Sequence, residues 1–324
     1  MRIAFIMDPL ANVAIDKDTT FALMLEAQHR GHESFHLGPR DLHLDGGRLF
    51  ATVRRATVRR EVGRHFELGD AEDHPIGHFD VVMQRKDPPF DDTYLYSTLL
   101  LERGVEHTFV VNDPRGLRDA NEKLYTCHFA DVMTDTIVDC DRARIAAFVD
   151  RVGGHAIVKP LHGAGGLGVL RLSRGDQNFH AILELLTEDG RRLVMVQRYL
   201  PDVRKGDKRI LLLDGEPLGA ILRVPRADEA RSNIHVGGSV VATELDDDDL
   251  RICARLRDPL RHDGLWFVGL DVIGGKLTEV NVTSPTGIQE MGRLDGKPRE
   301  PAVLDWLEGR AKSRKRRGPH GRHA

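Results

Sequence analysis

The first stretch whose residue types could do chemistry is a glycine-rich loop that follows a lysine. Lys159 ends an apolar, strand-like run, where an unpaired ammonium would be costly to bury. The loop comes shortly after it and consists of Gly163, Ala164, Gly165, Gly166, Leu167 and Gly168. Its glycines have the spacing of a dinucleotide-binding loop, but an alternating strand pattern follows instead of a helix, which excludes that type of site. A loop between two strands can still place backbone N–H groups on phosphate oxygens, although by itself it fits a plain glycine-rich hairpin equally well.

A second lysine could act together with this loop. Lys123 follows Asn121 and Glu122 near the start of a helical pattern. Taken alone, Lys123 fits an ordinary surface lysine. Together with Lys159 it could hold the two ends of a triphosphate, because each ammonium would gain an anionic partner.

Oxygen ligands gather in residues 267–282, which indicate two strands joined at Gly274-Gly275. Glu279 and Asn281 are two positions apart, so they point to one face of the second strand. Carboxylate and amide oxygens suit Mg²⁺, which also bridges substrate phosphates. A simple two-residue turn would place Asp271 on the opposite face, so a metal site requires either a three-residue loop or a β-bulge. Each acid alone would also fit a solvated or ion-paired strand residue.

The elements that must position these groups fall into two parts. Residues 1–121 alternate between strand and helix patterns, which predicts an open, mainly parallel sheet. Residues 122–308 begin with helical patterns at 121–130 and 142–152, followed by short strands at tight spacing, which favours antiparallel pairing. We divide this part into a central lobe at about 122–200 and a C-terminal lobe at about 201–308. A loop without periodicity at about 225–240 is typical of a lid or of a disordered segment.

Composition limits the possible partners and location. The 324 residues carry a net charge of −3 with both signs interspersed, so the balance gives no sign of a nucleic-acid or membrane partner. Three widely spaced cysteines and an N-terminus without a signal peptide favour a cytoplasmic protein. Residues 309–324 are strongly basic and predict a disordered tail, for which weak contact with a polyanion is the remaining alternative.

With these residues in place, the chain resembles the ATP-grasp superfamily and, more narrowly, bacterial glutathione synthetase. The resemblance covers about residues 1–290 and weakens after that. The motifs that carry it are Met7-Asp8-Pro9 with Lys17-Asp18-Thr19, Arg85 to Phe90, Leu117 to Lys123, Gly206 to Arg209, Phe267 to Asp271 and Glu279 to Thr286.

The resemblance implies an α/β protein with α+β lobes, the ATP-grasp fold with an N-terminal sheet domain, in a homotetramer. It implies ATP, Mg²⁺ or Mn²⁺, γ-glutamylcysteine and glycine as the molecules bound. The residues implied at the nucleotide are Lys123, Lys159, the loop 163–167, Gln197, Arg198, Tyr199, Leu200 and Asp207. The implied metal ligands are Asp271, Glu279 and Asn281, and the implied catalytic groups are Arg209 and Arg223, which suit developing negative charge.

The residues implied at the substrate have more alternative explanations than those implied at the nucleotide. The resemblance implies substrate contacts at Asp18, Arg85, Arg231, Asn233, Ser284 and Thr286. Asp18 would equally fit a helix cap, and Arg85 would equally fit a strand end stiffened by prolines. The family often has a basic residue after the lid glycines, where this chain has Ser239. Two alternatives remain at this point: another ATP-grasp carboxylate–amine ligase, or a nucleotide-binding regulator without catalysis.

Overall fold

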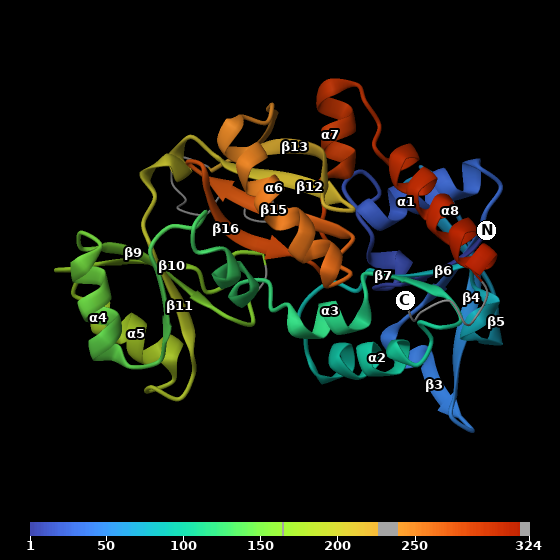
Figure 1. Cartoon of the computed structure of the whole chain (residues 1–324), viewed down its shortest axis with the longest axis horizontal. Coiled ribbons are helices and arrows are strands. Elements are labelled where there is room, and N and C mark those ends of the chain that lie inside the picture. Colours follow the sequence, from blue (N-terminus) through green and yellow to red (C-terminus); the bar gives the residue numbers. More distant parts are fainter. Residues whose placement is uncertain (164, 226–238, 318–324) are drawn as a thin grey trace.

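Three β-sheets organise the computed structural model, which describes residues 1–163, 165–225 and 239–317. One sheet belongs to the N-terminal domain, a second to the central lobe and a third to the C-terminal lobe. Figure 1 shows the central lobe at one end, the N-terminal domain at the other and the C-terminal sheet between them.

Four parallel strands form the centre of the N-terminal sheet, in the order β2, β1, β6 and β7. These strands are β1 (Arg2–Ile6), β2 (Glu33–Leu37), β6 (Val81–Gln84) and β7 (Phe109–Val111). The helices of this domain are α1 (Thr19–His29), α2 (Asp92–Glu102) and α3 (Pro114–Asp119). The apolar runs of these strands are almost fully buried, as expected for parallel strands covered on both faces. The predicted parallel sheet is therefore confirmed.

An antiparallel extension of this sheet was not predicted from the sequence. It consists of β3 (Leu42–Asp45), β4 (Arg48–Val58) and β5 (Phe66–Pro75), with β4 joined to β2. Seven of the ten residues of β5 are exposed and none is buried, so this strand lacks the apolar alternation that identifies a strand. Pairing with β4, rather than burial of its own side chains, holds it in place.

The central lobe is an antiparallel sheet in the order β10, β9, β11 and β8. Its elements are β8 (Thr136–Asp139), α4 (Arg142–Arg151), β9 (His155–Pro160), β10 (Leu170–Ser173), α5 (Phe179–Thr187) and β11 (Val194–Arg198). The two helices share a core with the sheet that includes Phe148, Val158 and Leu183. The helical pattern expected at 121–130 is a 3₁₀ helix over Leu124–Phe129.

The C-terminal lobe is a second antiparallel sheet, in the order β14, β13, β12, β15 and β16. Its elements are β12 (Asp207–Leu213), β13 (Glu216–Val224), β14 (Ser239–Ala242), α6 (Asp247–His262), β15 (Phe267–Ile273), β16 (Lys276–Asn281) and α7 (Ile288–Asp295). Helix α6 packs Ile252, Leu256 and Leu260 into the same core as β12, β15 and β16. This sheet faces the central lobe across the cleft that holds the site described below.

The C-terminal segment corrects an expectation. Residues 309–317 are not a disordered tail but the last turns of α8 (Glu300–Arg317). The basic composition concealed the helix, because Val303, Leu304 and Leu307 supply a short buried face before the charged run. The rest of the expected tail, residues 318–324, lies outside the described residues. None of the helices in the described part of the chain has the length and apolar character needed to cross a bilayer.

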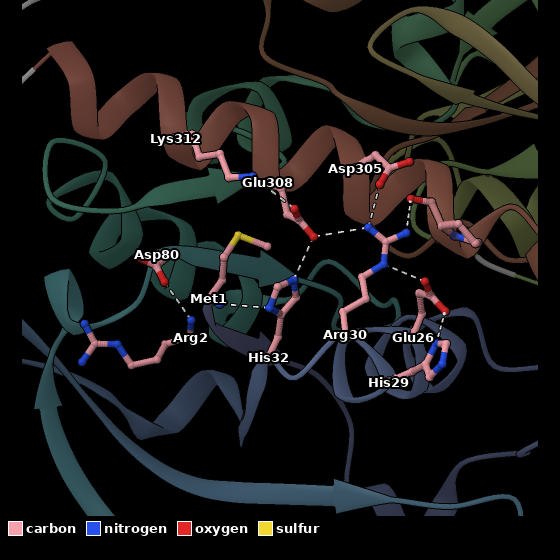
Figure 2. Close-up of polar contacts among 11 residues, drawn as sticks. Met1, Arg2, Glu26, His29, Arg30, His32, Asp80, Asp305, Glu308 and Lys312 are labelled. Carbon is pink, nitrogen blue, oxygen red and sulfur yellow. Dashed lines mark hydrogen bonds and ion pairs between the residues drawn. The ribbon is translucent and has the colours of Figure 1, made fainter.

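Helix α8 returns to the N-terminal domain and lies beside α1 (Figure 1). Arg30, just after α1, contacts Asp305 at 2.6 Å and Glu308 at 3.2 Å, and His32 Nε2 lies 3.0 Å from Glu308 Oε1. Figure 2 shows Glu308 between Arg30, His32 and Lys312. These contacts attach the end of the chain to the domain with which it begins.

The pKa of Glu308 gives this attachment a pH dependence that can be measured. The contacts with His32, Arg30 and Lys312 outweigh its burial and lower the pKa of Glu308 to about 2, from an ordinary value of 4.5. Because the folded pKa is depressed, the stabilisation is complete above about pH 4.5 and is lost as the pH falls toward 2. Glu308→Gln should therefore lower the free energy of unfolding at pH 7 by about 1 kcal/mol, a modest value for a partly exposed group.

Urea unfolding of the wild type and of Glu308→Gln, from pH 7 down to pH 3.5, measures this difference. The gap between the two proteins should narrow below pH 4.5. The exposed Glu106 provides the control, because Glu106→Gln should leave stability unchanged at every pH. A constant gap across the pH series would show that Glu308 contributes through packing and not through charge.

Candidate active site

The acidic hairpin of β15 and β16 presents its oxygen atoms on one face. The turn between the strands has two residues and is followed by a β-bulge at Thr278. The bulge sets Asp271 directly opposite Glu279, and Asn281 follows two residues later on the same face. Of the two solutions that the sequence left open, the structure has the bulge and not the longer loop.

Two arginines from neighbouring strands hold Asp271. Arg209 lies opposite Asp271 across β12 and β15, and its Nε donates to Asp271 Oδ1 at 2.6 Å. Arg223 Nη2 lies 3.0 Å from Asp271 Oδ1 and donates to Asp207 Oδ2 at 2.6 Å. Burial would raise the pKa of Asp271, but the two guanidinium groups outweigh it and hold that pKa below its ordinary value. The site therefore contains fixed charges of both signs at very low exposure.

The two lysines reach the same hairpin from the central lobe side. Lys123 Nζ lies 3.0 Å from Glu279 Oε1 and also donates to the carbonyl oxygen of Gly163. Lys159 Nζ donates to the carbonyl oxygen of Thr278 at 3.4 Å, and burial lowers the pKa of this lysine. Both ammonium groups thus contact the second strand of the hairpin, Lys123 at Glu279 and Lys159 at Thr278.

The pocket between the central and C-terminal sheets, here called the inter-sheet pocket, gathers the residues expected at the nucleotide. Those that line it are Lys123, Lys159, Gly163, Gly165, Gly166, Leu167, Gln197, Arg198, Tyr199, Leu200 and Asp207, with Asp271 and Glu279 beside them. Ile157, Val203 and Ile273 add apolar wall, which suits a flat base. The side-chain amide of Gln197 donates to Thr136 Oγ1 at 3.2 Å.

The glycine loop closes over this pocket between β9 and β10. At Gly163 an added Cβ would lie 2.9 Å from the carbonyl oxygen of Leu167, so a side chain there would force the loop open. Gly165 and Gly166 have φ values of +62° and +80°, which L-residues rarely adopt. Ala164 lies outside the described residues.

A second pocket opens between the N-terminal domain and the C-terminal lobe, with a volume of about 730 Å³. We call it the domain pocket. Its lining includes the expected substrate residues Asp18, Arg85, Ser284 and Thr286, together with Arg209, Arg223, Glu279 and Asn281. Gly165 and Glu279 line both pockets, so the two spaces meet at the acidic hairpin.

Asp18 and Arg85 have structural contacts as well as a place in the domain pocket. The Asp18 carboxylate caps α1 by accepting from the Phe21 N–H at 2.6 Å. The Arg85 guanidinium is buried and donates to Thr20 Oγ1 at 3.1 Å and to the carbonyl oxygen of Pro285 at 2.8 Å. Both interpretations of Asp18 are compatible with this geometry. Arg85 links the two domains and also lines the domain pocket, so its predicted substrate contact stays a prediction.

Part of the expected lid cannot be placed. Arg231 and Asn233 lie outside the described residues, as does the stretch 226–238. Ser239 is the first residue of β14, pairs with Val224 and is exposed.

Two residues that the sequence interpretation did not assign organise the site. The Glu122 carboxylate accepts from the backbone N–H groups of Val282 and Thr283 at 2.9 and 3.1 Å, and its burial raises its pKa. Asn112 donates to the carbonyl oxygens of Phe267 and Val282 at 2.9 and 2.8 Å. Glu122 could have been found, since it precedes Lys123 in a motif already noted. Asn112 carried no such signal.

Comparison with known proteins agrees with this architecture. The family model described as prokaryotic glutathione synthetase, N-terminal domain, matches residues 1–118. The model described as prokaryotic glutathione synthetase, ATP-grasp domain, matches residues 122–296.

Individual relatives match over nearly their whole length. Glutathione synthetase of Mesorhizobium japonicum is 47% identical over 96% of this chain and 99% of the relative. That of Synechocystis sp. is 45% identical over 95% of this chain and 99% of the relative. Among solved structures, the D-cycloserine synthetase DcsG superimposes with a TM-score of 0.65 at 18% identity, covering 95% of this chain and 100% of that one. At that identity the superposition speaks for the fold alone.

Proposed function

Because the chain belongs to the prokaryotic glutathione synthetase family, we propose that its inter-sheet pocket holds ATP and its domain pocket holds γ-glutamylcysteine. The protein is an ATP-dependent carboxylate–amine ligase that forms glutathione. In this proposal, glycine is the amine that attacks the activated cysteinyl carboxylate.

The meeting of the two pockets at Glu279 carries this proposal. A phosphoryl group transferred from a nucleotide in one pocket to a carboxylate in the other would pass beside Glu279, Arg209 and Arg223. Two guanidinium groups fixed in a poorly solvated site stabilise developing negative charge without having to reorganise. Their ion pairs with Asp207 and Asp271 hold them in place before substrate arrives.

The residues at the hairpin also fit a divalent cation such as Mg²⁺ or Mn²⁺. Asp271, Glu279 and Asn281 place oxygen atoms on one face, where those of Asp271 also accept from Arg209 and contact Arg223. Within the described residues, no group of three or more His, Cys, Asp or Glu side chains is arranged to hold a metal. The ligands proposed for the ion are two carboxylates and an amide, with nucleotide phosphates supplying further oxygens. When bound, such an ion offsets the negative charge of the phosphates.

The reaction then has two bond-forming steps. A cysteinyl carboxylate oxygen attacks the γ-phosphorus of ATP, and the bond to the bridging oxygen breaks to release ADP. The glycine amine next attacks the acyl carbon, a C–N bond forms, phosphate leaves with the acyl oxygen, and the amine gives up a proton. Lys123 and Lys159 hold the polyphosphate during the first step, and Arg209 and Arg223 face the charge that builds up in both. Segment 225–240, proposed as a lid with Arg231 and Asn233 on the substrate, would exclude water from the acyl phosphate.

Other parts of the assignment stay predictions. These are the division of the chain at residue 121, the adenine contacts of residues 197–200, the ribose contact of Asp207, the homotetramer and the cytoplasmic location.

Glycine-dependent release of ADP tests the proposed reaction. Purified protein with ATP, Mg²⁺ and γ-glutamylcysteine should release ADP at a rate that rises on addition of glycine, and removal of the metal with EDTA should abolish it. Alanine and β-alanine in place of glycine serve as controls for the amine. Faster release with one of these amines would favour another carboxylate–amine ligase, and no response to any amine would defeat the proposal.

A further inference from the structure

The first turn of α7 docks on the N-terminal domain at the loop before α1. Gln289 Nε2 donates to the carbonyl oxygen of Asp18 at 2.6 Å and to that of Ile15 at 3.3 Å. One turn later, Arg293 donates to the carbonyl oxygen of Asp16. These contacts fix α7 against residues 15–18, and the residue between them, Glu290, lines the domain pocket.

Glu290 is an acid whose position is costly without a partner. It is only 6% exposed, and its Oε2 is buried with no hydrogen-bond partner among the described residues. Its other oxygen lies 3.7 Å from Arg293 Nη2, too far for a good hydrogen bond. Burial raises the pKa of Glu290, and the contacts with its own backbone N–H, Arg293 and Lys17 offset this only in part.

A purely structural role explains Glu290 poorly. An acid in the third position of a helix often caps the helix start or meets its dipole from solvent. In α7 the first residue outside the helix is Gly287, which offers no side-chain cap, and no reciprocal capping contact forms. The Glu290 carboxylate is buried and accepts from its own backbone N–H, but its Oε2 has no partner in the described part of the chain and is left for something that enters the pocket.

The surroundings of Glu290 match a group that carries both signs of charge. Lys17 and Asp18 also line the domain pocket, as does Arg85 from the N-terminal sheet. Asp16 and Arg293 are the other charged groups that act on Glu290. An amino-acid head group, with an ammonium and a carboxylate on one carbon, would find partners of opposite sign here.

Glu290 also shares its pocket with Arg209, one of the groups proposed at the reacting carboxylate. Thr286, whose carbonyl oxygen lies 3.4 Å from Arg209 Nη1, precedes Glu290 by four residues. Arg209, Thr286 and Glu290 all line the domain pocket. One ligand in that pocket can therefore meet both side chains, with its cysteinyl carboxylate near Arg209 and its other end at Glu290.

We propose that Glu290 binds the α-ammonium of the γ-glutamyl group and so selects substrates that carry this charge. The proposal rests on the proposed function, because it assumes that the domain pocket holds γ-glutamylcysteine. It adds to the domain pocket a specificity-determining carboxylate that comes from α7.

Steady-state kinetics with two substrates test the proposal. N-glutarylcysteine differs from γ-glutamylcysteine only in having hydrogen in place of the α-ammonium. Glu290→Gln should raise KM for γ-glutamylcysteine about 10- to 100-fold, the usual effect of losing a hydrogen bond to a charged group. KM for N-glutarylcysteine, and KM for ATP and for glycine, should stay within about 3-fold of the wild-type values. N-glutarylcysteine and ATP carry no ammonium, and glycine is proposed to attack the cysteinyl carboxylate, not to occupy the γ-glutamyl site.

The outcomes separate this proposal from the function itself. Equal losses on both dipeptides would overturn the role of Glu290 while leaving the ligase reaction intact, whereas failure of the wild type on γ-glutamylcysteine would overturn the function. The exposed Glu184 offers a matched control, since Glu184→Gln should not change either KM. If Glu290→Gln does not fold, Glu290→Asp replaces it. The shortened carboxylate should weaken binding of γ-glutamylcysteine but not of N-glutarylcysteine. Equal weakening of both dipeptides again overturns the proposal.

Discussion

Glu279→Gln is expected to lower kcat by about 10²- to 10³-fold, the scale seen when one preorganised electrostatic contact is removed from a reacting centre. Glu279 lines both pockets and is the carboxylate partner of Lys123 at 3.0 Å. The amide keeps the shape but removes the charge, so both the cation site and the position of the lysine are weakened. The measurement is glycine-dependent ADP release across a range of Mg²⁺ concentrations.

The dependence on metal distinguishes the proposed role of Glu279 from general damage. If Glu279 is a ligand, the variant should need more Mg²⁺ for half-maximal rate, because an amide oxygen binds a divalent cation more weakly than a carboxylate. Glu216→Gln, an exposed substitution at the start of β13 in the same lobe, should leave kcat and the Mg²⁺ requirement unchanged. Wild-type kcat at low Mg²⁺ in Glu279→Gln would refute the metal assignment.

Arg223→Met is expected to impair both folding and turnover. Arg223 is 4% exposed and contacts two buried carboxylates, Asp207 and Asp271. Removing one member of a buried ion pair costs about 3 kcal/mol or more, because the remaining charge stays buried. Turnover should fall by about 10²-fold or more, since a fixed guanidinium beside the transferred group is lost. Urea unfolding and single-turnover ADP formation measure the two effects.

A lysine at the same position separates charge from shape. Arg223→Lys keeps the positive charge, so most of the stability should return, but an ammonium cannot reproduce the planar fork between two carboxylates and a phosphoryl group. Its turnover should therefore stay low. Arg257→Met, which removes an arginine paired with Glu216 on the surface, controls for the loss of an ion pair as such. Unchanged stability of Arg223→Met would contradict the buried-pair argument, and full turnover of Arg223→Lys would show that charge alone suffices.

The acidic hairpin was predicted well because the face on which its side chains lie depends on neighbouring residues of the same strands. The two-residue spacing of Glu279 and Asn281 fixes a common face through the pleat of one strand. The requirement that Asp271 share that face led to a short set of solutions, and the β-bulge at Thr278 is one of them. The bulge itself has no sequence signature, so the choice between loop and bulge came only from the structure.

The sequence-based predictions were incomplete or wrong for two segments whose structure depends on contacts with distant parts of the chain. Strand β5 is charged and exposed, and its pairing with β4 is not visible in its own residues. The end of α8 is basic enough to suggest disorder, but the helix is anchored earlier by apolar residues and by Glu308. In both cases a contact with a distant segment overrides the local preference.

Residue spacing along the chain was enough to predict the residue types of the site: a glycine loop, two lysines, and three oxygen ligands with strand spacing. Those features follow from backbone periodicity and from the chemistry of phosphate and Mg²⁺, so short stretches of sequence are enough to recognise them. Only the tertiary structure decided which charges meet. It paired Arg209 and Arg223 with Asp271 across three strands, joined the two pockets at Glu279, and buried Glu290 against the N-terminal domain. The reason is that electrostatic partners are set by distance in space, which the spacing of residues along one chain does not give.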